Sequence, residues 1–220
     1  MSNLIRQLNL FRSEVDKAVI SYSAWRTFHD QLVSDNSLKV NLNRNAAYWN
    51  ITQYSLQMSY YMALGRIFDC NGKSISIFKL VKACKSNVNE FSKESLALRK
   101  GDAWSAEYGK NVTVPESADF EKIRLKVKDF KILFDEKIQP VRHKVYAHLN
   151  DDSVDEMQSL FSKISVDEFE GVLHFLQQLH EHIWQLYYNG RLIKLEEGSF
   201  KNNEIITSDF KFIAEKVGKA

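Results

Sequence analysis

Hydrophobic residues recur at steps of three and four along most of the chain, which is the spacing of one face of an α-helix. The first such run predicts a helix over about residues 3–33, and a polar, Asn-rich segment at residues 35–45 predicts a loop or short helix after it. The apolar face of this first helix carries Leu4, Leu8, Phe11, Val15, Ala18, Tyr22, Trp25 and Leu32.

Two further helices are predicted on either side of the turn marked by Asn71-Gly72, and together they form a helical hairpin. Ser74 or Ser76 is available as the N-cap of the later helix. The small Gly65 of the earlier helix permits a close helix crossing. The apolar face of the earlier helix is Ala47, Ile51, Tyr54, Met58, Tyr61, Gly65 and Phe68, and that of the later one is Ile77, Leu80, Cys84, Val88 and Phe91.

Residues 99–118 show no period and predict a long loop. Trp104 and Tyr108 within it have two interpretations: they pin the loop to the core, or they stack on an exposed base. A fourth apolar run then begins, and its rhythm continues onto His148. Its members are Phe120, Ile123, Val127, Phe130, Phe134, Ile138, Val141 and Val145.

A capping box formed by Ser165 and Glu168 predicts the start of a fifth helix, which Asn189-Gly190 ends. The remaining tail is expected to hold a strand-like piece at residues 191–195 and a short helix after Thr207. These patterns predict an all-α fold of about five main antiparallel helices, with one domain over residues 1–190 and a tail at 191–220 that packs on it or extends from it.

Composition agrees with helices, since 220 residues contain only 8 Gly and 2 Pro. Cys70 and Cys84 form no disulfide framework and are expected to be reduced thiols. No signal-peptide core and no apolar run of spanning length occurs, so we expect a cytoplasmic protein without a membrane partner. The net charge of +2 is small, but eight basic against five acidic residues lie between Asp119 and Leu149, and seven acids against one lysine lie between Asp151 and Glu170. A basic helix is therefore followed by an acidic connector.

The segment from Pro140 to His148, Pro-Val-Arg-His-Lys-Val-Tyr-Ala-His, concentrates the residues that could perform chemistry. Pro140 either kinks one continuous helix or separates two pieces, and only the second arrangement frees N–H groups that would bind an anion. Beside such a helix start, the guanidinium of Arg142 suits a phosphate, and the imidazole of His148 can move protons near neutral pH. This combination favours phosphate-ester chemistry.

The same block, Arg142-His143-Lys144-Val145-Tyr146-Ala147-His148, resembles the signature of the HEPN family, most closely its abortive-infection U branch. The earlier block Leu64-Gly65-Arg66-Ile67-Phe68-Asp69 resembles the Arg-x-Phe-Asp signature of that branch. The resemblance implies a HEPN-like helical bundle that cleaves RNA without a metal or other cofactor. The ribose 2′-OH attacks the adjacent phosphorus and leaves a 2′,3′-cyclic phosphate and a 5′-hydroxyl. It also implies a toxin or phage-defence effector, with an antitoxin as a further partner.

Within that reaction, His148 would transfer protons, Arg142 would stabilise charge on the phosphoryl oxygens, and His143 would orient the substrate or supply a second proton-transfer group. In a regular α-helix Arg142 and His148 lie about 120° apart around the axis. Either the long arginine side chain bridges this gap, or a homodimer brings two copies of the block into one cleft, as the resemblance implies.

The residues around this block also have purely structural interpretations. Lys144 either holds a flanking phosphate or is an ordinary exposed lysine. Arg66 and Asp69 either form an ion pair within their helix or, together with Tyr146, contact and orient the catalytic residues. His174, His180 and His182 match no common metal spacing and are expected at the helix surface or an interface. The alternative for the whole chain is a non-catalytic HEPN-like module for binding or dimerisation, in which Arg142 is structural and His148 belongs to the core.

Overall fold

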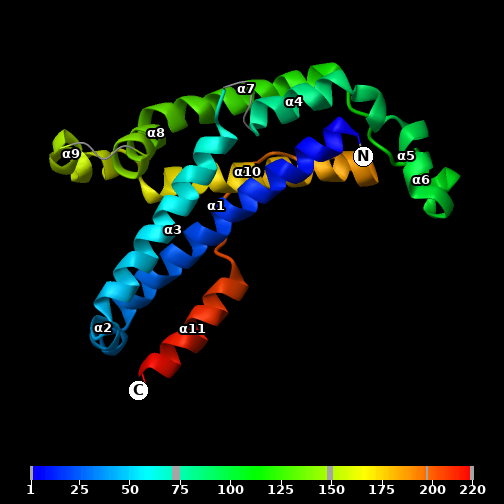
Figure 1. Cartoon of the computed structure of the whole chain (residues 1–220). Coiled ribbons are helices and arrows are strands. Elements are labelled where there is room, and N and C mark those ends of the chain that lie inside the picture. Colours follow the sequence, from blue (N-terminus) through cyan, green and yellow to red (C-terminus); the bar gives the residue numbers. More distant parts are fainter. Residues whose placement is uncertain (1, 71–74, 148–150, 197, 219–220) are drawn as a thin grey trace.

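The computed structural model describes residues 2–70, 75–147, 151–196 and 198–218, and this part of the chain is helical with no strand (Figure 1). The predicted all-α class is therefore confirmed. The elements are α1 (Asn3–Ser34), α2 (Asn36–Asn43), α3 (Ala46–Ile67), α4 (Ile77–Ser86), η1 (Val88–Phe91), α5 (Lys93–Lys100), η2 (Gly101–Ala103), α6 (Ala106–Lys110), α7 (Ser117–Leu133), η3 (Phe134–Ile138), α8 (Gln139–Val141), η4 (Arg142–Ala147), α9 (Asp151–Phe161), α10 (Val166–Asn189) and α11 (Glu204–Gly218).

The long helices α1 and α3 form an antiparallel pair that extends as an arm with α2 at its tip (Figure 1). Two polar contacts show the antiparallel register: Ser21 donates to Ser59, and Glu14 pairs with Arg66. Later residues of α1 therefore meet earlier residues of α3. The predicted face of α1 is buried from Leu4 through Tyr22. Burial of this stripe against α3, α4 and α10 holds the arm to the rest of the fold.

The segment α7 to η4 supplies the second long element, and it lies beside α4 and α10 (Figure 1). Its predicted stripe is buried at seven of eight positions, and the half-buried eighth residue, Phe130, stacks on Phe175 of α10 with ring centroids 4.0 Å apart. The capping box predicted for α10 is present, since Ser165 Oγ accepts from the Glu168 amide and the Glu168 carboxylate accepts from the Ser165 amide. Gly190 ends α10 at a positive φ of 58°.

Pro140 does not separate two helices, because the backbone stays helical from Ser117 to Ala147. The turns on either side of it are π-helical. The Gln139 amide reaches back five residues to the Phe134 carbonyl, and this wider turn gives the proline ring room. The interpretation of Arg142 as the exposed head of a helix with free N–H groups is therefore wrong, and any anion at this block must be held by side chains.

Two connecting regions are more helical than expected. Residues 99–118 contain the end of α5, η2 and α6, and Tyr108 pins them by donating to the Asn189 carbonyl at 2.8 Å. The tail has no strand at residues 191–195, and its helix α11 begins at Glu204, before the expected position. This helix runs parallel to α1, where Thr27 meets Thr207.

The predicted apolar face of α3 is buried only in its second half. Tyr61, Gly65 and Phe68 lie in the core, whereas Ile51 is 60% exposed and Met58 is 38% exposed. The face is one continuous seam with alternating steps of three and four, which is the seven-residue repeat of helix–helix interfaces. The first half of this face, from Ala47 to Met58, is exposed in the described part of the chain apart from the contact of Tyr54 with Tyr146.

Candidate functional site

The block that carries Arg142 packs antiparallel against α3, close to the earlier Gly65-Arg66 block. Arg142 lies over Gly65, and one turn later the ring of Tyr146 stacks on Tyr61 with centroids 5.2 Å apart. A methyl group on Gly65 would lie 2.2 Å from Nε of Arg142 and 2.5 Å from its Cδ. The two sequence blocks therefore meet in space, and Gly65 accommodates the arginine side chain rather than a helix backbone.

Arg142 is half-buried. Its Nε is shielded from solvent and has no hydrogen-bond acceptor among the described residues. A buried N–H that stays unpaired costs about 1–3 kcal/mol. This arrangement is a poor one for a purely structural arginine, which normally has its donors satisfied. It leaves at this position a fixed positive charge on a side chain that is only half-buried.

His143 and Lys144 follow Arg142 but lie on the exposed side of η4. Lys144 pairs with Glu156 of α9 at 2.5 Å, and this hydrogen bond holds the pKa of Glu156 below its ordinary value. The acidic connector thus lies against the basic block. A phosphate that binds Lys144 has to compete with this carboxylate.

His148, the predicted proton-transfer residue, lies outside the described residues. The stripe that leads to it is confirmed as far as Val145, which is buried. Asp69 is half-buried just after the end of α3, on the same stretch of chain as Gly65. The supporting roles of Asp69 and the catalytic role of His148 remain predictions.

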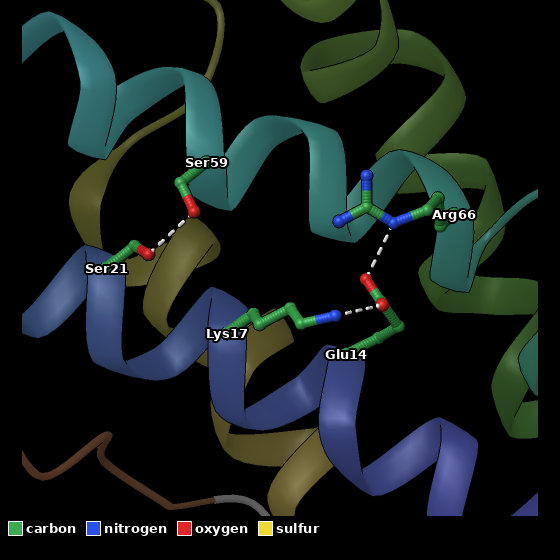
Figure 2. A network of polar contacts seen from close by, with 5 residues as sticks. All are labelled: Glu14, Lys17, Ser21, Ser59 and Arg66. Carbon is green, nitrogen blue, oxygen red and sulfur yellow. Dashed lines mark hydrogen bonds and ion pairs between the residues drawn. The ribbon is translucent and has the colours of Figure 1, made fainter.

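Arg66 forms an ion pair with Glu14 of α1, 2.7 Å from Nε to Oε2, so its partner comes from another helix (Figure 2). Lys17 binds the same carboxylate at 2.8 Å. Glu14 is only 5% exposed. Burial alone would raise the pKa of Glu14, but the hydrogen bonds from Lys17 and Arg66 outweigh it and lower the pKa. Arg66 therefore fixes α3 to α1 next to Gly65, the residue over which the Arg142 side chain lies.

Tyr146 is tied to α3 by more than its stacking on Tyr61. Its hydroxyl donates to Gln57 Oε1 at 3.1 Å, and its ring contacts Tyr54 at 5.6 Å. Burial raises the pKa of Tyr146 above its ordinary value, so the phenol stays protonated at neutral pH. The residue supports the position of η4 and is no general base.

The three histidines of α10 do not converge. His182 is buried and hydrogen-bonds the Ile193 carbonyl through Nδ1, so the expectation of a surface position is wrong for it. His174 lies against Gly198, and His180 faces Arg12 and Asp16. In the part of the chain that the structure describes, no group of three potential metal ligands occurs.

Sequence reasoning missed Glu14 and Gln57, and it expected a helix backbone rather than the Arg142 side chain against Gly65. Glu14 flanks the apolar stripe of α1 between Phe11 and Val15, which is the only sequence signal that it is buried. Gln57 and Gly65 stand eight residues apart on one face of α3, but Tyr146 lies 89 positions after Gln57 and Arg142 lies 77 positions after Gly65. Such pairings depend on how the helices pack and leave no local pattern.

A comparison with protein-family models matched HEPN_AbiU2, described as AbiU2, to residues 1–216. Searches of curated proteins and of solved structures found no match. No helix in the described ranges is both long and apolar enough to cross a bilayer. The family match covers both blocks and nearly the whole chain.

Proposed function

Because the chain belongs to the AbiU2 family of HEPN domains, which is associated with abortive infection, we propose that it is a metal-independent endoribonuclease. The observation that carries the proposal is the packing of the Arg142 side chain over Gly65. It brings the two family blocks together and leaves a half-buried guanidinium whose Nε has no acceptor among the described residues. The planar guanidinium of an arginine is suited to bidentate contact with a phosphoryl group.

The reaction transfers the phosphoryl group within the RNA strand. A base, His148 or His143, takes the proton of the ribose 2′-OH, and the 2′-oxygen forms a bond to the adjacent phosphorus. The bond from phosphorus to the 5′-oxygen breaks, and an acid returns a proton to that oxygen. Arg142 stabilises the negative charge that builds on the non-bridging oxygens. The products are a 2′,3′-cyclic phosphate and a 5′-hydroxyl.

Two copies of the chain supply the complete set of groups in this proposal. The exposed half of the α3 seam is continuous with the site, because Tyr54 on it contacts Tyr146. A second copy that covers the seam would therefore bring its own η4 block close to the first. The exposed half of the α3 seam beside the site therefore supports the predicted homodimer with a shared cleft.

The test uses purified protein, labelled single-stranded RNAs and excess EDTA. We expect cleavage with cyclic phosphate and 5′-hydroxyl ends, and no cleavage at a position where a single 2′-deoxyribose replaces the ribose. The deoxy position separates 2′-OH attack from hydrolysis by water. Products cut at the deoxy position, or cleavage that EDTA abolishes, would refute the mechanism.

A non-catalytic binding module is the second candidate. The observation in its favour is the ion pair between Lys144 and Glu156, which occupies one phosphate-binding group of the block. A wild-type protein that binds these RNAs but leaves every one intact, in the same assay and over a range of protein concentrations, would establish this alternative.

A further inference from the structure

A groove of about 720 Å³ runs between α4 and α7, which pack against each other (Figure 1). Its walls carry four cationic side chains against one acid, so its net charge is +3. The cations are Lys82 and Lys85 of α4 and Arg124 and Lys128 of α7, and the acid is Glu121 of α7. The helix α4 itself contains no acidic residue. The groove is therefore a concentrated positive patch on a chain whose whole net charge is only +2.

Two of the four cations have no acidic partner. Lys85 and Arg124 both bind Glu121, at 3.0 and 2.5 Å. The hydrogen bonds from Arg124 and Lys85 lower the pKa of Glu121 to about 2, so this carboxylate stays ionised and serves two cations. Lys82 and Lys128 are exposed and form no ion pair within the described ranges. Their charges are accessible to an anion from solvent.

The α7 wall of the groove is aligned with the proposed active site. Arg124, Lys128 and Arg142 each directly follow a buried member of the apolar stripe that runs from α7 to η4, so they lie along the same edge of that stripe. Between them, Lys131 pairs with Asp135 on this edge. Lys128 and Arg142 are separated by about 20 Å of helix. The buried members of the stripe are Ile123, Val127 and Val141.

We propose that the groove between α4 and α7 binds the phosphate backbone of the RNA strand that Arg142 engages. Single strands carry a charge on every phosphate, and a groove lined with cations can follow them. The strand passes from Arg142 along the edge of α7 into the groove, where Lys82 and Lys128 contact its phosphates. The role of the groove as a path for substrate rests on the proposed function, but RNA binding in the groove does not depend on cleavage.

An acidic amphipathic helix is the other kind of partner that a basic groove between two helices can accept. Such a helix needs an apolar floor for its anchoring side chains. At the floor of this groove Val81 is 3% exposed and Phe120 is fully buried, so only the half-buried Phe78 is open to an anchor. These three side chains offer little apolar area, whereas the cations are accessible. The observations therefore favour a phosphate backbone over a peptide.

The experiment measures RNA binding without cleavage. The probe is a fluorescent twelve-nucleotide RNA in which every ribose is 2′-O-methylated, and fluorescence anisotropy gives its affinity from 50 to 200 mM salt. The double variant Lys82→Gln with Lys128→Gln should weaken binding about tenfold and lower the salt slope by about 1.4, for two lost phosphate contacts. Lys39→Gln with Lys93→Gln is the matched control. It removes the same charge from exposed lysines of α2 and α5, outside the groove, and should keep the wild-type salt slope.

A second measurement locates the strand. The same RNA with one 4-thiouridine base is cross-linked to the wild type by light, and mass spectrometry should identify peptides of α4 or α7. The proposal is overturned if no cross-link reaches these helices, or if the groove variant binds RNA like the control. An acidic helical peptide of Glu and Leu that binds the wild type but not the groove variant, while RNA binds both equally, would assign the groove to a protein partner instead. Cleavage enters neither measurement, so a wild type that binds RNA through the groove without cutting it would refute only the proposed function.

Discussion

At the scale of single residues, the proposed reaction assigns different tasks to Arg142 and His148. Arg142→Ala and His148→Ala should each lower kcat/KM for RNA cleavage by about 10²–10⁴-fold, since one removes transition-state charge stabilisation and the other a proton-transfer group. Arg142→Lys keeps the charge but lacks the planar fork, so it should recover only part of the loss. Single-turnover kinetics with labelled RNA, on variants whose circular dichroism matches the wild type, measure these effects.

The non-catalytic alternative makes a different forecast for His148. If it is a core residue that continues the buried stripe of α7 to η4, His148→Ala should lower the free energy of unfolding and leave no cleavage to lose. Wild-type cleavage that a folded His148→Ala protein reproduces would remove His148 from the mechanism.

The buried Glu14 links stability to pH. Its pKa is lowered in the folded protein, so its contribution to stability is present above the unfolded pKa near 4.5 and is lost as the pH falls through the folded value. Arg66→Gln should destabilise the protein by about 1–3 kcal/mol at pH 7, because Arg66 is itself 43% exposed and Lys17 remains.

Urea unfolding at pH 7 and at about pH 3 measures this effect. The difference between Arg66→Gln and the wild type should shrink as the pH falls, because Glu14 takes up a proton and the ion pair is lost. Lys110→Gln is the control, since its pair with Glu107 is fully on the surface and should contribute less than about 0.5 kcal/mol. A difference that stays constant with pH would show that Arg66 does not act through Glu14.

At the scale of elements, the contact between α3 and η4 depends on a missing side chain. Gly65→Ala should favour the helix by about 0.5–1 kcal/mol from propensity, yet its methyl group would lie 2.2 Å from Arg142 Nε and must displace the guanidinium. We therefore expect RNA cleavage to fall at least tenfold while helicity is unchanged. Gly171→Ala is the matched control, because a methyl group there meets nothing within 4 Å. If Gly65→Ala cleaves RNA at the same rate as Gly171→Ala, the packing of Arg142 over Gly65 does not matter for catalysis.

The acidic helix α9 follows the block directly and holds Lys144 through Glu156. Glu156→Gln should release Lys144 and strengthen RNA binding several-fold at low salt, whereas Lys144→Ala should weaken it and reduce the salt slope by about 0.7 for one lost phosphate contact. Fluorescence anisotropy with an uncleavable RNA from 50 to 200 mM salt measures both. Glu107→Gln, whose partner is Lys110, is the control. Equal affinity of Glu156→Gln and the wild type at every salt concentration would contradict a phosphate role for Lys144.

The sequence predicted those elements whose signals are local. The stripes of α1 and α7, the Ser165 capping box and the Gly190 C-cap all follow from residues within one or two helical turns of each other. Two features could not be predicted in this way. The π-turns around Pro140 arise because a proline inside a buried helix needs a wider turn, and sequence spacing did not decide between a kink and a break. The contact of Glu14 with Arg66 joins residues 52 positions apart.

At the scale of the whole molecule, the α3 seam is buried at one end and exposed at the other, although its sequence pattern is uniform. A periodic apolar face is normally covered, and a second copy of the chain is the covering element that the proposed homodimer supplies. The same face carries the seat of Arg142. Dimerisation and the proposed active site are therefore expected to depend on one surface.

Ile51, which is 60% exposed on the seam, provides the test. Ile51→Asp should convert a dimer at micromolar concentration to a monomer and abolish cleavage, because a charge would be buried in the interface without a partner. Leu125→Asp is the control, since Leu125 is 52% exposed on α7, outside the seam, and should leave a dimer with full activity. Light scattering gives the mass, and activity against dilution gives the active species. A monomeric wild type whose activity stays proportional to concentration throughout dilution would refute the shared cleft, because each chain would then hold a complete site.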